Sequence, residues 1–251
     1  MKHISINRIL ARGLVLACVS TLCMGAFDAH AASIVQEFRA SPRILIFQWG
    51  PERARPQLIK DELSWLESSR EFLDGAFLYL DNTTFNVMNN SPFSYNTAAN
   101  ELAPLKNLAM TKFKYHMIQI DNNLNNPLPD PFDDWSVVIQ NWATVAKACK
   151  DFNLVGIAYD NEEYTGCLTC YSNKKYKSTK TIQQYSDQIA LRAKQIMEAA
   201  VAQYPQIAVL QMKGPYESEP KGPNDHCIYR TSGTHQFMGS FFAGLLEGKG
   251  D

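Results

Sequence analysis

Short apolar segments alternate with longer segments of helical periodicity along most of the chain. Five short segments rich in Ile, Leu, Val and Phe are expected to be strands, at residues 42–49, 75–81, 114–121, 154–160 and 207–213. Apolar residues recur every three or four positions in the intervening and following segments, which predicts helices at 56–69, 97–110, 135–152, 182–204 and 235–247. Strands that alternate with helices are typical of parallel βαβ units, so the pattern predicts an α/β fold.

Two α/β architectures fit this alternation, a (β/α)8 barrel and an open doubly wound sheet. The turn after the first strand, Gly50-Pro51-Glu52-Arg53, lacks the glycine fingerprint of a nucleotide-binding open sheet, and no cofactor is expected. A barrel has eight strand–helix units in about 250 residues. We therefore expect a (β/α)8 barrel of the TIM type that is cut off after about five units, incomplete at its C-terminus.

The N-terminus has the pattern of a secretory signal peptide over residues 1–31. A basic start is followed by the apolar run GLVLACVSTLCMGAF and by the small residues Ala29 and Ala31, the pattern of a cleavage site. A lipoprotein signal at Cys18 is the alternative, but the apolar run before Cys18 is short for one. We expect a secreted or periplasmic protein whose mature domain covers 32–251, with no membrane span because no later apolar run reaches about 20 residues.

Composition and charge are those of an ordinary globular domain and argue against one class of partner. The formal net charge is −1, hydrophobic residues make up 45% of the chain and charged residues 20%, as in ordinary globular domains. No basic patch or run is present, so nucleic acid is not expected as a partner.

Polar residues gather at the ends of the expected strands, where α/β proteins place their active sites. Alternation along the fourth strand puts Asp160 and Glu162 on one face, and we expect that face to line the barrel mouth. The same alternation is expected to bring in residues of the other strand ends, and the residues predicted to bind substrate are Trp49, Asp81, Gln119, Asp121, Tyr164, Gln211 and Lys213. For Asp81-Asn82 and Asp121-Asn122, a simple turn is the alternative interpretation.

The run Asp160-Asn161-Glu162-Glu163 holds more carboxylates than a turn needs. Like charges this close raise each other's pKa, which suits a general acid that stays protonated near neutral pH. We therefore expect Glu162 to be catalytic, with Asp160 beside it.

The fourth strand end resembles the signature of chitinase-type glycoside hydrolases, in which a D-x-D-x-E run follows a glycine. In Gly156-Ile157-Ala158-Tyr159-Asp160-Asn161-Glu162, the resemblance implies that Glu162 is the general acid and Asp160 the assisting residue. Ala158 stands where that family has its first Asp. Asn161-Glu162 is also similar to the Asn-Glu pair of retaining barrel glycosidases, so both resemblances imply a glycan substrate.

Three functions are consistent with these residues. The first is a secreted glycoside hydrolase in which Trp49 and Tyr164 offer flat faces to sugar rings. The second is a non-catalytic carbohydrate-binding barrel, which the alanine at position 158 favours. The third is a metal-dependent hydrolase with Asp81 and Asp121 among its oxygen ligands, but no spacing such as His-x-His supports it, and no metal is expected.

The cysteines of the mature chain are expected to differ in state. Cys149 lies on the apolar stripe of its helix and is expected to be a buried thiol. Export favours disulfides, so Cys167 or Cys170 is expected to be bridged, with Cys227 as the candidate partner. Zinc bound by the CxxC with Cys227 and His226 is the alternative, and a single CxxC is a weak signal for it.

Overall fold

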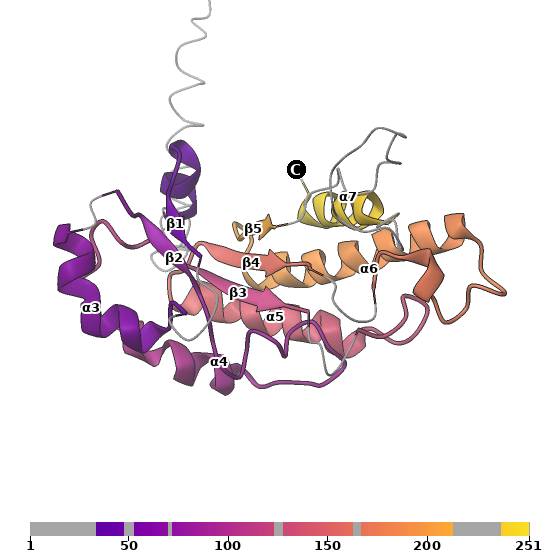
Figure 1. The fold of residues 1–251 in the computed structure, drawn as a ribbon, viewed down its shortest axis with the longest axis horizontal. Helices are drawn as coiled ribbons and strands as arrows, with labels where there is room; N and C mark the ends of the chain where they lie inside the picture. The colour runs from indigo at the N-terminus through magenta and orange to yellow at the C-terminus, as the bar shows by residue number, and fades with distance from the viewer. Residues whose placement is uncertain are drawn as a thin grey trace, which may run out of the picture.

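The computed structural model describes residues 34–47, 53–69, 72–122, 128–162, 167–212 and 237–250. They form an α/β fold in which strands and helices alternate (Figure 1). The strands are β1 (Leu45–Ile46), β2 (Gly75–Leu78), β3 (Met117–Asp121), β4 (Gly156–Asp160) and β5 (Ala208–Gln211). All five lie within the segments predicted from the apolar pattern, which confirms the α/β class.

Helices follow each of the strands. They are α3 (Pro56–Ser69), α4 (Tyr95–Leu102), α5 (Ser136–Asp151), α6 (Ile182–Gln203) and α7 (Met238–Lys249), with short 3-10 helices at Ala103–Leu105 and Tyr171–Asn173. Residues 34–40 are also helical, which the pattern did not predict. Of the described helices, none is long and apolar enough to cross a membrane.

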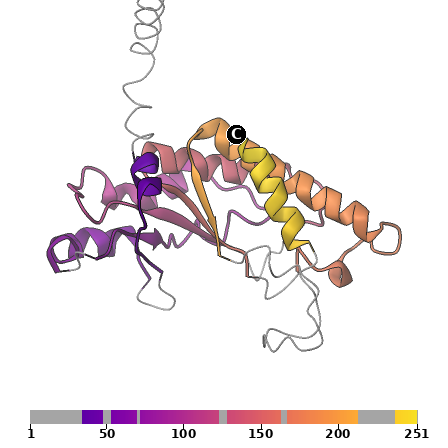
Figure 2. The same ribbon diagram turned by 90° about the horizontal axis from the view of Figure 1, so that it is seen from above.

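The sheet is entirely parallel and its strands follow chain order, β1-β2-β3-β4-β5. Crossovers between parallel strands are right-handed, so a strand order without a reversal places successive helices on the same face of the sheet. In Figure 1, α5 and α6 lie side by side along this face, and Figure 2 shows α7 against α6. A doubly wound sheet has a point where the strand order reverses, and the order of the described strands contains no such point.

The core lies between the sheet and its helices. On β4, Ile157 and Tyr159 point toward the helices, where the Tyr159 ring meets Trp142 of α5 edge-on at 5.9 Å between centroids. His116, before β3, is fully buried, and its Nδ1 accepts a hydrogen bond from the Ala76 amide at 3.2 Å. Burial lowers the pKa of His116 to about 4. The histidine is therefore a packed, neutral group.

Gly156 allows β4 and β5 to approach closely. Its φ is 154°, and a Cβ atom at this position would lie 1.9 Å from the Ala208 carbonyl oxygen of β5. Only glycine has neither the steric conflict nor the strained backbone. The start of β4 thus has room only for glycine where it pairs with Ala208 of β5.

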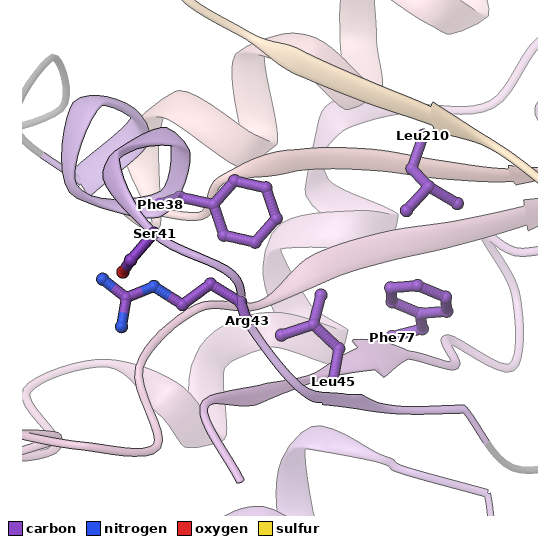
Figure 3. Close-up of a pocket in the computed structure, with 6 residues that line it drawn as sticks. All are labelled: Phe38, Ser41, Arg43, Leu45, Phe77 and Leu210. Carbon is purple, nitrogen blue, oxygen red and sulfur yellow. The ribbon is translucent and has the colours of Figure 1, made fainter. Parts of the chain in front are cut away.

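The second face of the sheet is concave and partly hollow. A cavity of about 330 Å³ is lined by Leu45 of β1, Phe77 of β2, Leu210 of β5 and Phe38 of the first helical segment. Figure 3 shows these four side chains directed into one space. Because the first and last described strands line the same cavity, the sheet curves as in a barrel wall.

Candidate functional site

A cluster of polar side chains lies at the carboxyl ends of β3 and β4, on the concave face. The register pairs Asp121 with Asp160 directly, and Gln119 with Ala158 one step before them. All three polar side chains are buried, with 2–3% exposure for Gln119, Asp121 and Asp160. The alternation in the sequence correctly predicted that these residues share a face.

Asp121 is a carboxyl group of this cluster with a raised pKa. Burial raises the pKa of Asp121 to about 7, and the negative charges of Asp160 and Glu162 add to the rise. Two groups lower the pKa of Asp121. The Gln119 amide donates to both Asp121 oxygens at 2.9 and 3.1 Å, and Arg53 contributes its positive charge. Near neutral pH the cluster therefore contains a carboxyl group that can hold or release a proton.

Asp160 connects the strand end to Glu162. The Glu162 amide donates to Asp160 Oδ1 at 3.1 Å, and the half-buried Glu162 lies close enough for its charge to act on Asp121. The structure thus brings together Asp121, Asp160 and Glu162, as the sequence predicted. Three carboxyl groups with an amide and a guanidinium form a site that can donate a proton and stabilise positive charge.

Arg53 belongs to this site and was missed by sequence reasoning. It follows β1 in the chain, and its guanidinium lies 4.0 Å from the centre of the Tyr79 ring beyond β2. Its charge lowers the pKa of Asp121. One feature of the sequence could have pointed to Arg53. It follows an expected strand, and the ends of parallel strands lie at the same edge of a sheet.

Asp81 lies apart from the buried pair. It is exposed and forms an ion pair with Arg55, 3.0 Å from Nη2 to Oδ1. Residues 81–86 form a turn in which the Asn82 amide donates to Glu101 Oε1 at 2.7 Å. The turn interpretation of Asp81-Asn82 is therefore confirmed, and its predicted role in substrate binding stays a prediction.

The expectation that Gln211 shares the inner face is wrong. The register pairs Gln211 with Tyr159, which faces the helices, and Gln211 Nε2 donates to the sulfur of Met238 in α7 at 3.2 Å. Leu210 takes the inner position instead. Three other predicted site residues, Trp49, Tyr164 and Lys213, lie outside the described residues.

The described residues contain no group of three or more His, Cys, Asp or Glu side chains arranged to hold a metal ion. Asp81, one of the expected ligands, is paired with Arg55 at the surface. The metal-dependent hydrolase therefore gains no support from this part of the chain.

The loop after β4 is closed by a disulfide between Cys167 and Cys170. The prediction that one of these cysteines is bridged is confirmed, but the pairing with Cys227, which lies outside the described residues, is wrong. Because thiolates bind zinc and a disulfide does not, zinc held by this CxxC is also excluded. Cys149 is a free, fully buried thiol, and burial raises its pKa.

The fold and the site define a class, an α/β protein with a parallel sheet and a carboxylate cluster at the carboxyl ends of its strands. No protein-family model matches the chain, and no curated protein or solved structure matches it significantly.

Proposed function

We propose that the protein is a secreted glycoside hydrolase in which Glu162 is the general acid and Asp160 assists it. The observation that carries this proposal is the buried Asp121–Asp160 pair beside Glu162, at the strand ends of a parallel sheet. Glycosidic cleavage needs an acid that protonates the leaving oxygen and a second group that stabilises or attacks the sugar centre. A cluster of carboxyl groups, one of which holds a proton near neutral pH, is suited to both tasks.

The proposed roles follow from position. Glu162 is half-buried at the rim and reaches substrate first, while Asp160 is buried beneath it. Asp160 faces the developing positive charge of the oxocarbenium-like transition state and stabilises it. Gln119 and Asp121 complete the floor of the substrate-binding site, and Trp49, Tyr164 and Lys213 are proposed to add contacts at its rim.

The proposed architecture is part of a (β/α)8 barrel. Three observations favour it: the strand order never reverses, the helices follow one another along a single face, and β1 and β5 line one cavity. In such barrels the active site lies at the carboxyl ends of the strands, where the carboxylate cluster is found.

A second candidate is a carbohydrate-binding barrel without catalysis. The observation that favours it is Ala158, which occupies the inner face where the chitinase-type signature has a carboxylate. The buried amide and carboxyl groups would then bind sugar hydroxyls. Export, predicted from residues 1–31, is compatible with either role.

The two candidates are separated by incubating the purified mature chain with a panel of oligosaccharides and aryl glycosides. The hydrolase is expected to release new reducing ends or aglycone in proportion to protein concentration. Binding measured by calorimetry without release of product would favour the second candidate. Neither binding nor cleavage on any member of a broad panel would contradict both.

A further inference from the structure

The backbone of Glu162 is held on both sides by side chains at the ends of two strands. Its amide donates to Asp160 Oδ1 at 3.1 Å, and its carbonyl oxygen accepts from Asn122 Nδ2, also at 3.1 Å. Glu162 lies two residues beyond the last residue of β4, where the ladder of the sheet no longer fixes the chain. These two bonds therefore tie the position of Glu162 to the ends of β3 and β4.

Asn122 is itself oriented by a buried hydroxyl. Tyr159 donates its hydroxyl hydrogen to Asn122 Oδ1 at 3.0 Å, which leaves the amide nitrogen to point at Glu162. Tyr159 is 1% exposed, and its ring packs against Trp142 of α5 and Phe241 of α7, each 5.9 Å away between centroids. A contact chain thus runs from the helical core through Tyr159 and Asn122 to Glu162.

We propose that Asn122 is a positioning residue for Glu162 and that the Tyr159 hydroxyl sets the orientation of the Asn122 amide. The assignment rests on the proposed role of Glu162 as general acid. A displacement of about 1 Å at a reacting group can lower a rate by about 100-fold, so a general acid beyond a strand end needs fixed support. Side chains in a packed core supply that support more rigidly than a loop does.

The most direct test compares two buried tyrosines, each changed to phenylalanine. Tyr159→Phe removes the hydroxyl that orients Asn122. Tyr204→Phe removes a hydroxyl that donates to the Leu154 carbonyl at 3.1 Å, just before the first residue of β4 and away from Glu162. Both variants lose one hydrogen bond from a buried side chain, so their melting temperatures should fall by similar amounts. On a cleaved glycan, Tyr159→Phe should lower kcat roughly tenfold with KM nearly unchanged, and Tyr204→Phe should keep wild-type kcat.

A second variant, Asn122→Ala, removes the hydrogen bond to the Glu162 carbonyl at a residue that is less buried than Tyr159. Asn122 is half-buried, so Asn122→Ala should fold and should lower kcat at least as much as Tyr159→Phe. Wild-type kcat in both Asn122→Ala and Tyr159→Phe would overturn the assignment. Equal losses in Tyr159→Phe and Tyr204→Phe would overturn it as well, because they would reveal general destabilisation.

A measurement that needs no substrate separates this inference from the proposed function. Hydrogen exchange of the Glu162 amide, followed by NMR, reports how firmly the segment is held. Tyr159→Phe and Asn122→Ala should each raise that exchange rate about threefold or more, and Tyr204→Phe should not. If no glycan is cleaved and the exchange rates still change in this way, the proposed function fails while the support of Glu162 stands. Unchanged exchange in both variants would overturn the support.

Discussion

At the scale of single residues, the unusual feature is a buried pair of carboxyl groups on adjacent strands. Asp121 and Asp160 are register partners, and both are 3% exposed. Negative charges on these paired, buried residues repel each other, which favours the protonated form of Asp121. The raised pKa of Asp121, about 7, reflects burial first and this repulsion second.

The first prediction concerns how stability depends on pH. Unfolded, Asp121 loses its proton near pH 4; folded, it keeps the proton up to about pH 7. Its contribution to stability is therefore complete below pH 4 and is lost as pH rises toward 7, a loss on the order of 4 kcal/mol. Asp121→Asn should remove much of this loss, which urea unfolding at pH 5 and pH 8 would measure.

The control for this prediction is a carboxylate on the exposed side of α6. Asp187 accepts a hydrogen bond from Gln183 at 2.8 Å and lies far along the chain from the pair. Asp187→Asn should leave the difference in unfolding free energy between pH 5 and pH 8 unchanged. An equal pH dependence in Asp121→Asn and wild type would show that Asp121 titrates normally.

Residue-level predictions succeeded where alternation and burial agreed. Gln119, Asp121 and Asp160 were predicted on one face because each alternates with large apolar residues that must face the helices. Gln211 was misplaced because both faces of a barrel-like strand are apolar, so alternation does not tell the inner face from the outer one. The face of Gln211 follows from the strand register, which pairs Leu210 with Ala158 on the inner face and Gln211 with Tyr159 on the outer face. That register depends on how the whole sheet assembles.

At the scale of elements, β4 depends on a glycine. The second prediction is that Gly156→Ala destabilises the fold by about 3 kcal/mol or more, because the new Cβ would meet Ala208 and the φ of 154° suits glycine. Chemical denaturation of the two proteins measures the difference. Gly250→Ala is the control, because it introduces backbone strain without a steric clash. The φ of Gly250 is 71°, but no atom lies within 4 Å of the added Cβ, so this change should cost no more than about 2 kcal/mol of stability. A smaller effect at Gly156 than at Gly250 would contradict this account of the β4–β5 contact.

Element boundaries were predicted less well than element types. The helix expected at 97–110 begins at Tyr95 because Ser94 caps it, with its side chain accepting from the Thr97 amide at 3.3 Å. It gives way after Leu102 to a 3-10 turn that contains Pro104, which lacks an amide hydrogen for the helical ladder. Periodicity locates an apolar stripe, whereas caps and prolines decide where the helix starts and stops.

The third prediction concerns the oxidation states of Cys149, Cys167 and Cys170. Peptide mapping without reduction should find Cys167 and Cys170 joined to each other, and Cys149 unmodified by alkylating reagent in the native protein. The reason is that Cys149 is fully buried and its raised pKa keeps it as a thiol. Rapid alkylation of native Cys149, or a bridge from Cys167 to Cys227, would contradict the described arrangement.

At the scale of the whole molecule, the site is assembled from three separate stretches of the chain. Arg53 follows β1, Gln119 and Asp121 come from β3, and Asp160 leads from β4 to Glu162. The sequence predicted the two strand contributions, because strand ends in parallel sheets meet at one edge. It did not predict Arg53 or Asn122, because a loop residue's direction depends on tertiary contacts such as the Tyr79 ring and the Tyr159 hydroxyl.

The most direct test of the whole account is the catalytic rate of Glu162→Gln on a glycan that the wild-type protein cleaves. Removal of a general acid should lower kcat by about 100-fold or more, while the fold and melting temperature stay close to wild type. Glu198→Gln, a change on the exposed side of α6, should keep wild-type kcat. A Glu162→Gln variant that cleaves the same glycan at the wild-type rate would contradict the account.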